Sequence, residues 1–141
     1  MRFLSIVFIL LLPIISRGQV DDRITTIEFV EALNGHVEET RFYYQNNWQV
    51  LRKKALDRRY IHSYELLETS YSANSPFHFI LKTTYSDQAQ FDAREEHFQE
   101  LIKEKGPILL LNAIEPGDFR KSVFYAEKVS HWNWEWTVAN T

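Results

Sequence analysis

Apolar and polar residues alternate along four segments of the chain, the periodicity of β-strands that bury one face. The first segment is rich in β-branched residues and is broken by Asn34-Gly35. The second and third are separated by a turn-forming stretch at residues 72–76. We therefore expect four strands, over residues 24–33, 61–69, 77–85 and 120–129.

Two segments between these strands have helical periodicity. Residues 36–58 contain no Gly or Pro, and one helix face recurs every three or four positions, at Val37, Thr40, Tyr44, Trp48, Leu51 and Ala55. A second helix is expected over residues 88–105, capped by Ser86 or Asp87 and ended by Gly106-Pro107. Residues 108–114 are expected to add another helical turn or two, and Pro116-Gly117 to turn the chain.

The resulting order β-α-β-β-α-β predicts an α+β protein with the ferredoxin-like split βαββαβ arrangement. Such a fold is a four-stranded antiparallel sheet with two helices on one face. The strand faces are both partly apolar: Ile27 and Phe29 share one face of the first strand, and Val30 and Ala32 share the other. A mixed second face suggests that a second copy covers it, so we expect a homodimer whose two sheets enclose a cavity.

The N-terminus has the pattern of a secretory signal peptide: Arg2, an apolar run of about a dozen residues, and small residues Ser16 and Gly18 before Gln19. We expect cleavage near Gly18/Gln19 and a secreted or periplasmic bacterial protein with no membrane contact afterwards. The chain then divides into residues 1–18 as signal peptide, 19–130 as one domain and 131–141 as a Trp-rich tail.

Composition narrows the classes of function. The whole chain has a net charge of −3, and removing Arg2 and Arg17 with the signal makes the rest more acidic, so nucleic acid is not an expected partner. The absence of cysteine excludes disulfides, thiol nucleophiles and Cys-based metal centres. The five histidines show no metal-ligand spacing, so no metal is expected.

Several stretches resemble the antibiotic-biosynthesis-monooxygenase-like proteins of the dimeric α/β-barrel superfamily. Residues 59–67 are similar to their second strand, residues 77–87 to their third strand with its terminal aromatic, and residues 34–39 to their strand-to-helix turn. The pair His97-Phe98 is similar to a His-Phe on their second helix. The resemblance implies a ferredoxin-like subunit that dimerises. Members include cofactor-independent monooxygenases, haem-degrading enzymes and isomerases, and no cofactor is expected here.

One set of candidate residues would carry catalysis. His97 could act as a base toward a phenolic substrate, with Tyr85 and Tyr64 orienting that substrate. The structural alternatives are that His97 caps an edge of the core and that Tyr85 packs in the core or at its rim. The haem-degrading members are expected to have an Asn on the first strand and a Trp at the end of the third. In this chain the first strand has no Asn, and the position at the end of the third strand is Tyr85.

A second set would bind a ligand. Glu28, His62 and His78 could face the space between two sheets together with Tyr64, although both histidines could instead be exposed strand residues. Trp48 belongs to an aromatic stripe at helical spacing, which forms either core or a ligand box. The basic run at residues 52–59 is either a solvated helix end or a patch for an anionic ligand.

Three functions remain open. The first is a secreted homodimer that binds a small aromatic or apolar molecule between its sheets. The second is a cofactor-independent monooxygenase acting on a phenol or quinol. The third is a non-catalytic structural protein that makes contact through Trp132, Trp134 and Trp136, which point to one side of an extended segment.

Overall fold

The computed structural model describes residues 21–132, so the expected signal peptide and most of the expected tail lie outside the described residues. Its strands are β1 (Ile24–Ala32), β2 (Ser63–Glu68), β3 (Phe79–Tyr85) and β4 (Arg120–Ser130). Its helices are α1 (Val37–Tyr43), the π-helix η1 (Tyr44–Trp48), α2 (Gln49–Asp57), α3 (Gln88–Asp92), α4 (Arg94–Lys105) and α5 (Pro116–Phe119).

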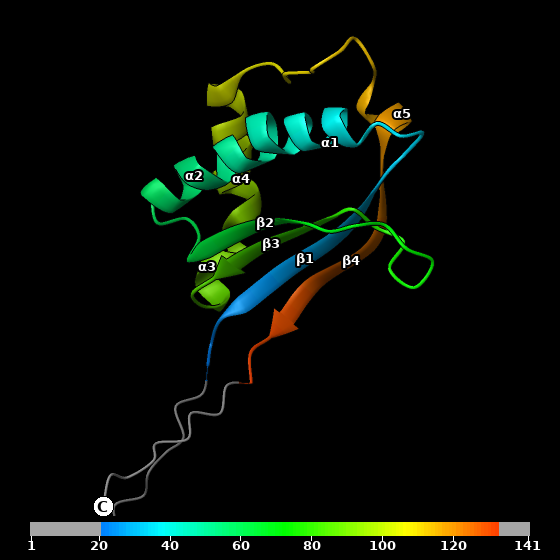
Figure 1. Cartoon of the computed structure of the whole chain (residues 1–141). Coiled ribbons are helices and arrows are strands. Elements are labelled where there is room, and N and C mark those ends of the chain that lie inside the picture. The colour runs from blue at the N-terminus through cyan, green and yellow to red at the C-terminus, as the bar shows by residue number, and fades with distance from the viewer. Residues whose placement is uncertain (1–20, 133–141) are drawn as a thin grey trace, which may run out of the picture.

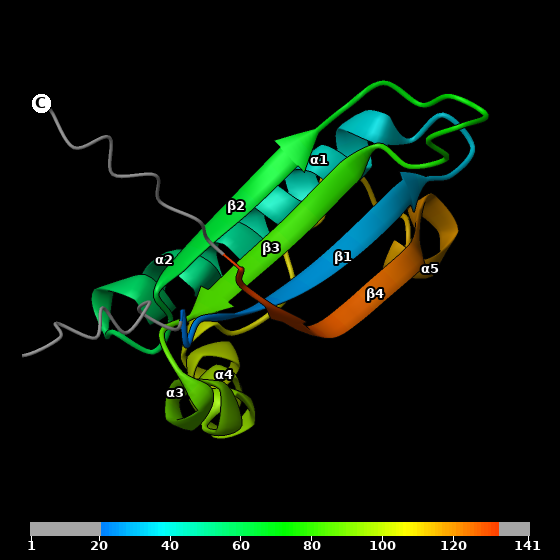
Figure 2. The same cartoon turned by 90° about the horizontal axis from the view of Figure 1, so that it is seen from below.

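The four strands form one antiparallel sheet in the order β2-β3-β1-β4. This confirms the predicted α+β class, and the arrangement is consistent with a ferredoxin-like fold. The helices α1, α2 and α4 lie on one side of the sheet, as Figure 1 shows. Figure 2 looks onto the opposite side, where the described residues place no helix over the sheet. We call this side the open face.

The first long helix is continuous from α1 through η1 to α2, and the structure places a π turn in its middle. The side chains of Asn46 and Asn47 donate to the backbone carbonyls of Phe42 and Tyr43, at 2.8 and 2.9 Å. Asparagine that bonds to the backbone in this way competes with regular helix bonding. The predicted helix face is confirmed, since none of its six residues is exposed.

The second long helix is broken at Ala93, where ψ is −3°. Of the two predicted caps, Asp87 is the one used: its carboxylate accepts a 2.8 Å hydrogen bond from the backbone N–H of Gln90. Phe91 on α3 and Leu101 on α4 are both buried. The break lets each short helix present its own apolar residue to the core.

The prediction of a helix over residues 108–114 is wrong, and the expected turn at Pro116-Gly117 takes the form of a short helix, α5. Proline suits the first turn of a helix because its missing N–H would be unpaired there anyway. Leu109 is held in an irregular segment instead, because Asn47 binds both its backbone N–H and its backbone carbonyl, each at 2.8 Å.

Replacing Asn47 with alanine is expected to lower the free energy of unfolding by about 1–3 kcal/mol, because the buried Asn47 amide holds the part-buried backbone N–H and carbonyl of Leu109 and both lose their partner. Hydrogen exchange at the Leu109 amide should accelerate in the same variant. The matched control is Asn46→Ala, because within residues 21–132 the Asn46 side chain makes only the local bond to Phe42. Equal effects of the two substitutions on Leu109 exchange would contradict this role of Asn47.

The core lies between the sheet and the helices, in two clusters. One contains Ile24, Ala55, Ile61, Tyr85, Phe91 and Leu101. The other contains Val30, Ala32, Tyr44, Phe79 and Leu81. The alternation placed these pairs on opposite faces of the first strand, and in the structure Val30 and Ala32 are buried while Ile27 and Phe29 are only half-buried. The sheet therefore has a fully packed helix side and a partly apolar open face.

Of the predicted tail, the structure describes only its first residues. The Nε2 atom of His131 lies 2.7 Å from Oγ1 of the buried Thr25, which fixes the end of β4 to β1. Trp132 is 89% exposed. Trp134 and Trp136 lie outside the described residues, so the contact expected of the three tryptophans stays a prediction.

Candidate functional site

A cavity of about 270 Å³ lies between the sheet and the helices α2 and α4. Six of the residues that line it are aromatic or aliphatic: Trp48, Leu81, Tyr85, Phe98, Ile102 and Tyr125. The other six are polar or charged: Thr26, Glu28, Arg52, Thr83, Arg94 and Glu95. Small-molecule sites combine apolar walls with convergent polar groups, and the residues that line this cavity are evenly divided between the two kinds. The volume suits a ligand of one or two rings.

Arg52 is the most unusual group in this cavity. Its guanidinium carbon lies 4.7 Å from the ring centre of Trp48 and 4.1 Å from that of Phe98, so the cation is stacked between two aromatic rings. Its Nε atom donates a 3.1 Å hydrogen bond to Oγ1 of Thr83. Burial lowers the pKa of Arg52 to about 10, which still leaves the side chain cationic at pH 7.

The local fold explains this position. Trp48 ends η1, and Arg52 follows four residues later in α2, so both side chains project from the same helix face. Phe98 comes from α4 on the other side of the cavity. Thr83 sits in the middle of β3, on the strand side that faces the helices. Three elements that are distant in sequence therefore fix the orientation of one guanidinium.

Arg94, the second arginine at the cavity, is already satisfied. Its Nη2 atom bonds to the carboxylate of Glu127, and Nη1 donates to the carbonyl of Phe91 at 3.0 Å. Glu95 is exposed and lies 3.7 Å from Nε of Arg94. Among residues 21–132, neither Arg52 nor Glu28 forms an ion pair within 4.0 Å. The unpaired charges at this cavity are thus one cation on α2 and one carboxylate on β1.

Two tyrosines at the cavity can donate hydrogen bonds. Tyr85 is buried at the end of β3, edge-on to Phe91, and burial raises the pKa of its hydroxyl. Burial also raises the pKa of the Tyr125 hydroxyl on β4. Both hydroxyls are therefore protonated at pH 7. Tyr85 belongs to the core and also lines the cavity, so it is placed where it could contact a ligand, and its role there stays a prediction.

The structure separates the three residues proposed for catalysis. The imidazole of His97 stacks flat on the ring of Tyr60, with 3.6 Å between the centres and 6° between the planes. Its buried Nδ1 has no hydrogen-bond partner among the described residues. Tyr64 packs beside the core cluster that contains Tyr85, 6.0 Å from the ring of Trp48. His97 and Tyr64 do not line the cavity, so the mechanism with His97 as base stays a prediction.

The proposed ligand-binding residues are also distributed over different places. Glu28 and Trp48 line the cavity, on the helix side of the sheet. Glu28 and Tyr64 thus do not face the open side, where we expected them, because their strand registers turn them toward the helices. His62 is exposed, just before β2. Nδ1 of His78 accepts a 3.0 Å hydrogen bond from the backbone N–H of Ala32, which is a structural role.

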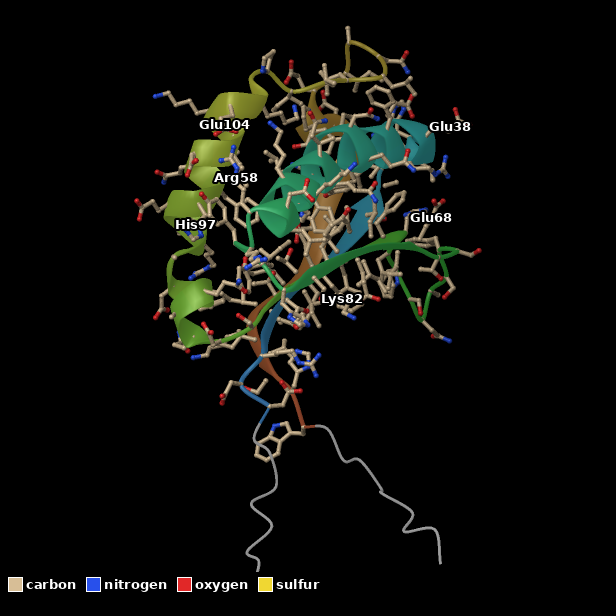
Figure 3. All side chains as sticks on the ribbon, turned by 90° about the vertical axis from the view of Figure 1, so that its left-hand side faces the viewer. Glu38, Arg58, Glu68, Lys82, His97 and Glu104 are labelled. Atoms are coloured by element: carbon tan, nitrogen blue, oxygen red, sulfur yellow. The ribbon has the colours of Figure 1, made fainter. Side chains whose placement is uncertain are left out.

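Sequence reasoning missed Arg52 as an individual residue and treated it as one member of a basic helix end. The run is in fact divided by the structure. Arg58 bonds to Glu100 and Glu104 on α4 at 2.7 Å each, and Figure 3 shows Arg58 close to Glu104. Arg52 turns inward instead. The available signal was its spacing of four from Trp48, which places it on the apolar helix face.

Two further observations hold for residues 21–132. No three His, Asp or Glu side chains there lie close enough together to hold a metal ion. None of the described helices combines the length and apolar character needed to cross a membrane.

The fold and the cavity define a small α+β protein with a ligand-sized space between a four-stranded sheet and its helices. The crystal structure of HapK from Hahella chejuensis is similar, with a TM-score of 0.50 over 82% of this chain and 99% of that chain. At 16% sequence identity, this similarity concerns the fold alone. The chain matches no protein-family model and no curated protein.

Proposed function

We propose that this protein binds a small, partly aromatic molecule in the cavity between β1, β3 and the helices α2 and α4. The observation that carries the proposal is the cavity wall itself, in which Trp48 and Phe98 from the helices oppose Leu81 and Tyr85 from the sheet. Aromatic walls provide large contact areas and favour stacking with planar ligands. The sequence resemblance to antibiotic-biosynthesis-monooxygenase-like proteins supports a ligand of this kind.

The test is calorimetric titration with 2-naphthamide, a neutral two-ring probe. We expect saturable binding with one site per chain. Thr26→Trp should abolish the binding, because the half-buried Thr26 lines the cavity and an indole there would fill it. Gln45→Trp, on the exposed surface of the first helix, is the matched control and should bind normally. Failure of the wild-type protein to bind, or equal binding by both variants, would overturn the proposal.

We further propose that two copies associate through their open faces into a dimeric α/β barrel. Phe29 on β1 lies 4.7 Å from the ring centre of Phe77 and 5.6 Å from that of Phe124, so aromatic side chains form a continuous patch there. Leu67 and Ile80, paired across β2 and β3, extend the patch. Apolar patches of this kind are typical of protein–protein contacts. The superfamily resemblance supports the same arrangement, and the signal-like N-terminus supports an exported dimer.

A further inference from the structure

The geometry points to an aromatic carboxylate as the ligand, with Arg52 as the residue that binds its carboxylate group. This inference deepens the proposed function, because it rests on the cavity between the sheet and the helices being a ligand site. It adds the charge of the ligand and the position of its charged group, which the aromatic walls alone do not determine.

The first step of the argument is the state of the Arg52 guanidinium. A cation withdrawn from water in a protein normally has a carboxylate partner. Arg52 has none among residues 21–132, where its one hydrogen bond uses Nε and runs to the uncharged Thr83. The two terminal nitrogens of the fork are therefore left without an anionic partner in this part of the chain, although the side chain borders a cavity.

The second step is orientation. The rings of Trp48 and Phe98 lie on the guanidinium at 4.7 and 4.1 Å, and the bond to Thr83 fixes its rotation about the stacking direction. A planar fork held in this way is preorganised for two parallel hydrogen bonds to a carboxylate. Preorganisation matters because the binding of a ligand then costs little side-chain entropy.

The third step is a comparison with three other arginines, Arg94, Arg58 and Arg41. Arg94 is bonded to Glu127, Arg58 to Glu100 and Glu104, and Arg41 to Glu68. Each of these cations is neutralised by an acidic residue from another element. Arg52 differs from these three in being turned inward with no ion-pair partner within 4.0 Å among residues 21–132, since Glu28 acts on it only at longer range. Arg120 also lacks an ion pair there, but its terminal nitrogens bond to the hydroxyls of Tyr44 and Tyr43. A guanidinium whose terminal nitrogens have no such partner at a cavity is the arrangement expected of a group that meets an anionic ligand.

Glu28 limits where the anion can lie. This carboxylate also borders the cavity and forms no ion pair within the described residues, so it repels an anion. The carboxylate of the ligand should therefore lie at the Arg52 end, against the terminal nitrogens of the guanidinium, while the ring system extends toward Glu28. A hydroxyl group on that ring system could donate a hydrogen bond to Glu28.

The experiment compares 2-naphthoate with 2-naphthamide, which has almost the same shape and no charge, by calorimetric titration at pH 7. The wild-type protein should bind the carboxylate at least about tenfold more tightly, the scale of one charge-assisted hydrogen-bond pair. Arg52→Met should remove that preference while leaving 2-naphthamide binding nearly unchanged. Arg52→Lys should retain part of the preference, because an ammonium keeps the charge but not the fork.

Glu28→Gln provides an effect of the opposite sign. Removing the carboxylate should increase the affinity for 2-naphthoate by a few-fold and leave 2-naphthamide nearly unaffected, since only the anion feels the charge. Arg41→Met is the matched control for loss of a cation, because Arg41 lies outside the cavity at the surface and pairs with Glu68. It should bind both probes like the wild type.

The outcomes separate this inference from the proposed function. Equal wild-type affinities for the two probes, or a preference that survives in Arg52→Met, would overturn the role of Arg52 while the binding cavity stands. Loss of both probes in Arg52→Met would also overturn it, because the residue would then support the shape of the cavity rather than recognise charge. Failure of the wild-type protein to bind either probe would overturn the proposed function itself.

Discussion

Replacing Phe79 with alanine is expected to lower the free energy of unfolding by about 3–5 kcal/mol, the usual cost of removing a large aromatic side chain from a packed core. Phe79 is 1% exposed and belongs to the core cluster with Val30, Tyr44 and Leu81. It begins β3, whose neighbours on both sides are β1 and β2. The resulting cavity would therefore open between the centre of the sheet and the π turn.

Urea denaturation followed by far-ultraviolet circular dichroism measures this change, at one fixed protein concentration because association would shift the apparent stability. The matched control is Tyr71→Ala, which removes an aromatic side chain that is 49% exposed. It should change the free energy of unfolding by no more than about 0.5 kcal/mol. A Phe79→Ala effect as small as that of the control would mean that the core cluster around Phe79 is not packed as described.

The strands were predictable because their signal is local. Alternation in residues 24–33 requires only that one face is buried, and Val30 and Ala32 are indeed buried while Phe29 is not. The helix over residues 36–58 was predictable for the same reason, since its apolar spacing outweighs one irregular turn. The order of these elements leaves few ways to form a single antiparallel sheet, so the α+β class followed from it.

The details that build the cavity depend on contacts between distant residues. The π turn follows from Asn46 and Asn47, which bond to the backbone of the preceding turn, and Asn47 also holds Leu109. Residues 108–114 were predicted to be helical from their apolar character, but this contact holds Leu109 in irregular structure. No periodicity in the sequence reports such a bond.

The position of the candidate site shows the same limit. Arg52 is one basic residue among several in sequence, and only the approach of α4 brings Phe98 over its guanidinium. His97, the neighbour of Phe98, was the more conspicuous residue because imidazole titrates near neutral pH. Adjacent helix residues point in directions about a quarter-turn apart, so His97 meets Tyr60 while Phe98 meets the cavity.

Phe124→Asp is expected to convert the proposed dimer into single chains. Phe124 lies on the open face beside Phe29 and is 57% exposed in one chain, so an aspartate there should cost the isolated fold little. In a dimer formed through this face, the same carboxylate would be buried in an apolar interface without a partner. Such a charge costs about 3 kcal/mol or more, which weakens association at least about a hundredfold.

Sedimentation velocity measures the association, and circular dichroism checks that the variant remains folded. The matched control is Ile108→Asp, because Ile108 is 56% exposed and lies in the segment after α4, on the helix side of the molecule in Figure 1. It should sediment as the wild-type dimer does, since only the open face is proposed to be buried. A wild-type protein that sediments as a single chain would contradict the dimer. A Phe124→Asp variant that stays dimeric would show that association uses another surface, because the aspartate would then still be in water.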